Sequence, residues 1–99
     1  MSSQPYYLKI RVREFKADEF LNNANSVGAY VLSNNEDTTV ILHGGVLQFY
    51  YDAQLNEWVI HVYGNIHSLV ALLYEYINAS NTYVSVEPIM QCGNYCCDE

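Results

Sequence analysis

Lysine and arginine are absent from most of this sequence. All four basic residues lie within the first sixteen positions, whereas residues 17–99 carry ten carboxylates and neither lysine nor arginine. The formal net charge is −7. Because nucleic-acid backbones and anionic membranes attract proteins through lysine and arginine, this charge disfavours both as partners.

Charges of either sign are also few. Charged residues make up 15% of the chain, against roughly 25% in an average globular domain. Neutral polar groups must therefore supply much of the surface, and the ten tyrosines can bury a ring while keeping the hydroxyl in water. In acid, protonation of the carboxylates leaves only a small positive charge, so we expect the protein to tolerate low pH.

Long apolar runs are missing as well. No segment approaches the roughly 20 residues that span a bilayer, and no basic-then-apolar leader opens the sequence. We therefore expect a soluble protein that is not exported. The length of 99 residues fits one domain, and an apolar content of 51% argues against disorder. We expect residues 1–99 to form a single domain.

Catalytic and nucleotide-binding motifs are not found. The sequence has no Walker loop, no G-x-G-x-x-G, no G-x-S-x-G and no helical H-E-x-x-H. The pair Gly44-Gly45 is too short to cradle phosphate. It predicts a two-residue hairpin, with a kink in one long strand as the alternative. We therefore predict neither an enzyme nor a cofactor.

Hydrophobic periodicity predicts the secondary structure. Alternation and short β-branched or aromatic runs predict strands, and an i, i+3, i+4 spacing predicts two amphipathic helices. Pro88 is expected to end the last strand, leaving residues 88–99 as an irregular tail. The predicted strands are 6–14, 29–32, 38–43, 46–51, 58–63 and 82–87, and the predicted helices are 17–25 and one that begins after Asn65 and extends to Asn78. This order predicts an α+β domain of two layers, in which one mainly antiparallel sheet of five to six strands carries both helices on one face.

The first predicted strand holds most of the basic residues. Alternation places Tyr7, Lys9, Arg11 and Arg13 on one face of this strand. The resulting stripe could bind an acidic partner, or it could simply pair with carboxylates such as Glu87 across the sheet. Aromatic and cationic side chains together could also contact single-stranded nucleic acid.

Three cysteines, Cys92, Cys96 and Cys97, lie in the last eight positions. The neighbouring Asp98 and Glu99 disfavour a thiolate, so we expect no catalytic cysteine. Adjacent cysteines rarely bond each other, so a disulfide would join Cys92 to Cys96 or Cys97, or would join two chains.

The three histidines do not define a metal site. The cysteine spacing lacks the paired short knuckles of a structural zinc site, and we predict no metal. His43, His61 and His67 are interpreted as a turn residue, a strand residue and a first-turn helix residue. None has a partner in the sequence that would indicate acid–base chemistry.

The whole chain resembles small proteins of the filamentous viruses of thermoacidophilic archaea, of the Acidianus filamentous virus type. The resemblance rests on the opening PYYLKIRVREF, the middle rich in tyrosine and asparagine, and the ending QCGNYCCDE. It implies a double-stranded DNA virus of a hot, acidic habitat, and therefore a thermostable, acid-stable viral protein in the host cytoplasm. It carries over no functional residue.

These observations lead to three hypotheses. The first is an accessory protein that binds a host or viral protein through Tyr7, Lys9, Arg11 and Arg13, because a surface rich in tyrosine and poor in charge favours protein contacts. The second is a single-stranded nucleic-acid binder that uses the same face. The third is a self-assembling structural component, and a homodimer is a further arrangement that the sequence allows.

Overall fold

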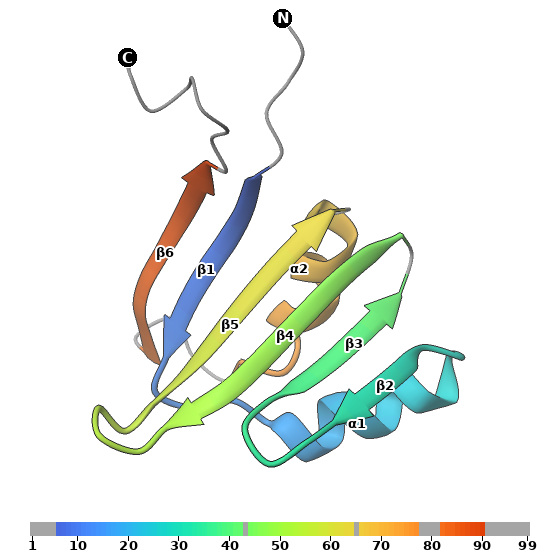
Figure 1. Cartoon of the computed structure of the whole chain (residues 1–99), viewed down its shortest axis with the longest axis horizontal. Coiled ribbons are helices and arrows are strands. Elements are labelled where there is room, and N and C mark those ends of the chain that lie inside the picture. The colour runs from blue at the N-terminus through green and yellow to red at the C-terminus, as the bar shows by residue number, and fades with distance from the viewer. Residues whose placement is uncertain (1–5, 43, 65, 78–81, 91–99) are drawn as a thin grey trace, which may run out of the picture.

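A computed structural model of the chain describes residues 6–42, 44–64, 66–77 and 82–90. These residues contain strands and helices in the order β-α-β-β-β-β-α-β (Figure 1). The elements are β1 (Tyr6–Val12), α1 (Ala17–Ser26), β2 (Tyr30–Ser33), β3 (Thr38–Leu42), β4 (Gly45–Asp52), β5 (Glu57–Gly64), α2 (Ile66–Tyr74) and β6 (Tyr83–Met90).

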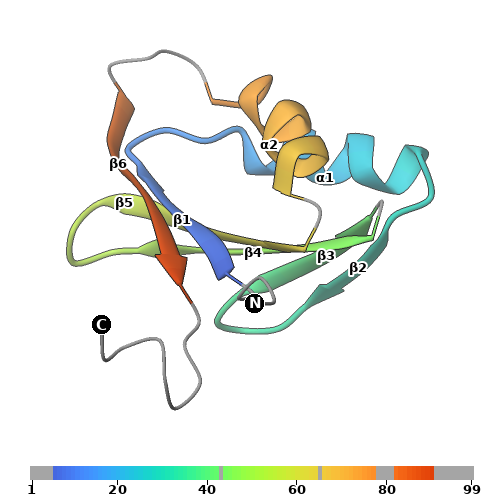
Figure 2. The same cartoon turned by 90° about the horizontal axis from the view of Figure 1, so that it is seen from above.

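The strands form one six-stranded antiparallel sheet in the order β2-β3-β4-β5-β1-β6. The first strand of the chain therefore lies inside the sheet, between β5 and β6. Both helices lie on the same side of the sheet (Figure 2). This arrangement confirms the predicted α+β fold with one antiparallel sheet and two helices.

The hydrophobic core fills the space between the sheet and the helices. Alternate strand residues such as Val12 and Leu47 are fully buried there, together with Phe20 of α1 and Leu69 of α2. The Phe20 ring lies at 6.1 Å from the ring of Phe49, in an edge-to-face arrangement. Burial of these large side chains provides most of the driving force for folding.

Helix α1 forms within one residue of its predicted bounds. Asp18 and Glu19 lie in its first turn, where carboxylates interact favourably with the helix dipole. The helix ends at Ser26, and the chain then turns at Gly28, whose φ is 87°. Glycine adopts this left-handed conformation without steric cost, so the predicted end of the helix is confirmed.

Helix α2 is shorter than its apolar stripe predicted. It ends at Tyr74, although Ile77 is still buried in the core. The backbone carbonyl of Tyr76 instead accepts a hydrogen bond of 2.8 Å from the N–H of Lys16, which ties this turn to the start of α1. No helix in the described ranges is both long enough and apolar enough to cross a membrane.

The two glycines at 44 and 45 belong to a hairpin, and a kinked single strand is excluded. Leu42 pairs with Gly45, so the connection consists of residue 43, which lies outside the described ranges, and Gly44, whose φ is 76°. Gly45 already belongs to β4. A Cβ atom at Gly64 would lie 2.8 Å from the carbonyl oxygen of Gly44, so this corner of the sheet requires glycine.

Two strand ends differ from the prediction by more than one residue. β1 ends at Val12 rather than at residue 14, because the chain bends at Arg13, whose N–H donates a 2.8 Å hydrogen bond to the carbonyl of Thr82. β6 continues through Pro88 to Met90, so the prediction of an irregular tail is wrong for residues 88–90. An edge strand tolerates proline because one side of its backbone has no partner strand.

Candidate functional site

The candidate site is the face of the sheet opposite the helices, which we call the open face (Figure 2). Side chains on this face alternate with core residues along each strand, and the strand register shows which of them lie side by side. The open face consists of Tyr7, Lys9, Arg11, Tyr30, Leu32, Thr39, Ile41, Val46, Gln48, Tyr50, Asp52, Glu57, Val59, His61, Tyr63, Ser85, Glu87 and Ile89.

One line of residues across the open face contains no charge. The register pairs these residues directly from one edge of the sheet to the other, and we call the line the apolar row. Its two residues nearest the β2 edge are largely solvent-exposed, with Tyr30 at 62% and Ile41 at 40%. The apolar row consists of Tyr30, Ile41, Val46, Tyr63, Tyr7 and Ile89, from β2, β3, β4, β5, β1 and β6.

Charge increases with distance from the apolar row. The next line across the sheet contains Lys9 and Glu87, which are directly opposite each other on β1 and β6. Arg11 lies one line further, and Asp52 and Glu57 form the last pair. The open face therefore has an uncharged end and a charged end.

Aromatic rings gather in the middle of the open face. The rings of Tyr7 and His61 are stacked, with centroids 5.2 Å apart and planes inclined by 12°. The Tyr63 ring lies 4.8 Å from the Tyr7 ring, and the Tyr63 hydroxyl is 3.5 Å from Nδ1 of His61. Tyr50 approaches His61 from β4 at 6.5 Å. These contacts hold the rings in fixed relative positions.

The environment of His61 favours the neutral imidazole. Burial lowers the pKa of His61 below its ordinary value of 6.5, and the positive charge of Lys9 lowers this pKa further. Its Nε2 atom is buried without a hydrogen-bond partner in the described part of the chain. Burial also raises the pKa of Tyr63. His61 is therefore uncharged at neutral pH and behaves as a polar aromatic residue.

Arg11 forms an ion pair with Glu57, a residue that the sequence did not indicate as part of any site. Its Nη2 and Nε atoms lie 2.7 Å and 2.9 Å from Oε1 of Glu57. The Glu57 residue is only 7% exposed. A carboxylate this buried requires a charged or hydrogen-bonding partner. The structure thus assigns Arg11 a local pairing role across the sheet, and its partner is the carboxylate of Glu57.

Lys9 differs from Arg11. It is half-buried on the open face, directly opposite Glu87 in the register. Within the described residues it forms no ion pair within 4.0 Å. Its charge is therefore available to a ligand, apart from its electrostatic effect on His61.

Arg13 lies beyond the end of the strand that carries the other predicted residues. It follows the end of β1, in the bend that leads to α1, and its side chain is exposed. The structure therefore brings together Tyr7, Lys9 and Arg11 of the predicted binding set, and it places Arg13 apart from them.

The other candidate ligands fall largely outside the described ranges. Cys92, Cys96, Cys97 and His43 are not among the described residues, so the disulfide alternatives stay predictions. His67 is exposed in the first turn of α2, on the opposite side of the sheet from His61. No group of three or more metal-ligating side chains occurs in the described part of the chain.

No protein family, no curated protein and no solved structure matches this chain.

Proposed function

We propose that this chain is a non-enzymatic module that binds another protein through the open face of its sheet. In this proposal it is a viral accessory protein of the Acidianus filamentous virus type, and it acts in the host cytoplasm on a host or viral protein. The apolar row is the observation that supports the proposal most directly.

The exposure of the apolar row is unusual for an antiparallel sheet. A sheet with one face in water normally alternates apolar residues toward the core with polar residues toward solvent. Here Tyr30 and Ile41, the first two residues of the apolar row, face solvent. The row continues from them without a charged residue across the other four strands of the sheet. Contiguous exposed apolar patches mark interaction sites, and tyrosine is enriched at protein interfaces.

The chemistry of the open face defines the partner. A sheet presents a shallow surface, so the partner must offer a similarly flat apolar surface over the row. Lys9 lies next to Tyr7 on β1, at the border of the row, and its charge has no ion-pair partner among the described residues. A carboxylate on the partner can meet it there. Arg11 contributes less because Glu57 already neutralises it.

A pair of matched variants tests this proposal. Leu32 on the open face and Val86 on the opposite face are strand residues with nearly equal exposure, 50% and 51%. Leu32→Glu and Val86→Glu therefore make the same change on opposite sides of the sheet. Partners are identified by affinity purification from host-cell lysate, and the purified partner is then titrated calorimetrically.

We expect Leu32→Glu to weaken binding by about tenfold or more, because a carboxylate must be desolvated in the contact. Val86→Glu should bind as the wild type does. Circular dichroism confirms that both variants are folded. Equal binding by both variants would show that the open face is not the contact surface.

Binding of single-stranded nucleic acid is the second candidate. The stack of Tyr7 on His61, with Lys9 beside it, combines the aromatic and cationic groups that contact bases and phosphates. A labelled oligonucleotide should then raise fluorescence anisotropy, with an affinity that falls steeply as salt increases and that Tyr7→Leu reduces. Absence of binding at low salt excludes this candidate.

Self-association is the third candidate, since the apolar row could contact its counterpart in a second copy. A homodimer through the open face would appear in sedimentation experiments as a mass that increases with concentration in the wild type. Leu32→Glu, but not Val86→Glu, should then remain monomeric. A monomer at all concentrations would exclude this arrangement.

A further inference from the structure

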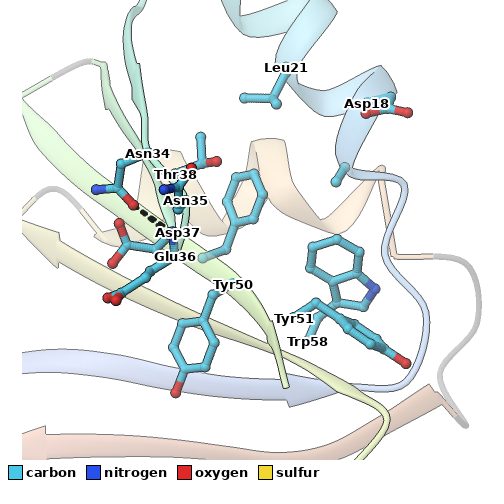
Figure 3. Close-up of a pocket in the computed structure, with 12 residues that line it drawn as sticks. Asp18, Leu21, Asn34, Asn35, Glu36, Asp37, Thr38, Tyr50, Tyr51 and Trp58 are labelled. Carbon is cyan, nitrogen blue, oxygen red and sulfur yellow. Dashed lines mark hydrogen bonds between the residues drawn. The ribbon is translucent and has the colours of Figure 1, made fainter. Parts of the chain in front are cut away.

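A groove of about 350 Å³ lies at the end of the sheet where β3 stops and β4 continues. Thr38, the first residue of β3, pairs with Phe49, but β4 extends beyond Phe49 to Asp52. Over these last residues β4 pairs with β5 alone among the described strands. The turn between β2 and β3 lies on one side of the resulting notch, and Trp58 and Tyr51 lie on the other (Figure 3).

Aromatic rings form one wall of this groove. Tyr51 and Trp58 lie with centroids 5.2 Å apart and planes inclined by 64°, and Phe49 lies 6.0 Å from Trp58. The Tyr51 hydroxyl donates a 3.1 Å hydrogen bond to Oδ1 of Asn56, which fixes the orientation of the ring. Tyr51 is 47% exposed, so the groove is accessible to a ligand along this wall.

The opposite wall is polar and acidic. Asn34 organises the turn, because its Oδ1 accepts the backbone N–H groups of Glu36 and Asp37 at 2.7 Å and 2.9 Å. The carboxylates of Glu36 and Asp37 form no ion pair within the described part of the chain, and neither does that of Asp18, which lines the groove from α1 (Figure 3). Neither lysine nor arginine is among the residues that line this groove.

An aromatic wall opposite an acidic wall restricts the class of ligand that the groove can bind. An anion would be repelled by the carboxylates, and an uncharged apolar molecule would remove them from water without compensation. A small metal ion would gain nothing from the aromatic wall, and the described residues contain no metal-ligating cluster. A cation with an apolar periphery interacts favourably with both walls, because aromatic faces and carboxylates both attract positive charge.

We propose that this groove binds an organic cation, namely an alkylammonium group. The group can belong to a free amine or to a lysine side chain of another protein. Tyr50 belongs both to the open face and to the lining of the groove, whereas Leu32, the residue that tests the protein-binding face, does not line the groove. The two proposals are therefore tested by different residues, Leu32 for the open face and Tyr51 for the groove.

Trp58 provides the signal for the test. It is the single tryptophan of the chain and it lines the groove. Choline is titrated into the 99-residue chain while tryptophan emission is recorded, and the control ligand is 3,3-dimethyl-1-butanol, in which carbon replaces the charged nitrogen. We expect a saturable change with choline, with a dissociation constant on the order of 1 mM, and binding at least about tenfold weaker for the uncharged isostere.

Variants connect this signal to the groove. Tyr51→Leu removes an aromatic face and should weaken choline binding by about tenfold, whereas Tyr51→Phe keeps the ring and should bind as the wild type does. Asp37→Asn should weaken choline binding by about threefold. Glu75→Gln, which also replaces a carboxylate by an amide but lies outside the groove, should leave choline binding unaltered. Near-ultraviolet circular dichroism confirms that each variant is folded.

A lysine derivative blocked at both backbone ends identifies the source of the cation. Binding of this derivative as well as choline supports the site and assigns it to lysine side chains of proteins. Binding of choline without the derivative supports the site and assigns it to free quaternary amines. Equal responses to choline and its uncharged isostere, or equal binding by Tyr51→Leu and the wild type, would overturn the proposal.

Discussion

The two faces of this sheet are built from similar residues but have different surroundings. On β4, Leu47 and Phe49 are buried beneath the helices, while their neighbours Val46 and Tyr50 point to the open face. Burial by the helices accounts for the apolar residues on the face that the helices cover. It does not account for the apolar residues on the open face, because stability does not require apolar residues to face water. This difference separates residues that maintain the fold from residues that we expect to bind.

The largest effect should come from the core between the helices and the sheet face that they cover. Phe20→Ala removes a fully buried ring that contacts Phe15, Phe49 and Tyr76. We expect a loss of about 3–5 kcal/mol in the free energy of unfolding, since the cavity adds to the lost transfer energy. Tyr30→Ala on the open face should cost no more than about 0.5 kcal/mol. Urea denaturation measures both, and equal losses would contradict the distinction between the faces.

A smaller effect is expected at the charged end of the open face. Glu57→Ala leaves Arg11 without its partner in a half-buried position, which should cost about 1–3 kcal/mol. Replacing both residues in the double variant Arg11→Met/Glu57→Leu should recover most of this loss, because no charge is then left unpaired. A double variant as unstable as Glu57→Ala would show that the pair itself contributes net stability.

The sequence predicted the helices and strands of this fold better than the order in which the strands pair in the sheet. Alternation in β1 and the helical spacing after Ala17 are local patterns, and both elements begin where they were expected, although β1 ends two residues earlier than predicted. The strand order is not local, so nothing in the sequence showed that β1 lies between β5 and β6. Pro88 was misjudged for this reason, because its effect depends on β6 being an edge strand.

The candidate sites show the same limit. The shared face of Lys9 and Arg11 follows from strand alternation alone. Glu57, however, is 46 positions from Arg11 in the sequence, and only the register of β1 with β5 brings them together. The groove beside Trp58 combines α1, the β2–β3 turn and the strands β3, β4 and β5, so no spacing of residues in the sequence could predict it.

The titration of His61, in the aromatic centre of the open face, should make the stability of the protein depend on pH. Because the folded-state pKa of His61 is below 6.5, the native state binds fewer protons than the unfolded chain in the interval between the two pKa values. The stabilisation is therefore complete above pH 6.5 and is lost as the pH falls from 6.5 toward the lowered pKa. In His61→Gln this component is absent, so its stability should change less over the same interval. Parallel pH profiles of the two proteins, measured by urea denaturation, would contradict this prediction.

The smallest effect concerns the electrostatic link between Lys9 and His61. Lys9→Glu replaces a positive charge that disfavours the imidazolium with a negative charge that favours it, so the pKa of His61 should rise. Stability at neutral pH should change by no more than about 0.5 kcal/mol. Lys16→Glu, the same change in an exposed residue before α1, should leave the pKa of His61 unaltered. NMR titration of the His61 ring protons measures this pKa in each variant. A rise in Lys9→Glu alone would show that the charge of Lys9 reaches the aromatic cluster of the open face; the same pKa in both variants would mean that solvent screens it, and that Lys9 could then attract a partner only through direct contact.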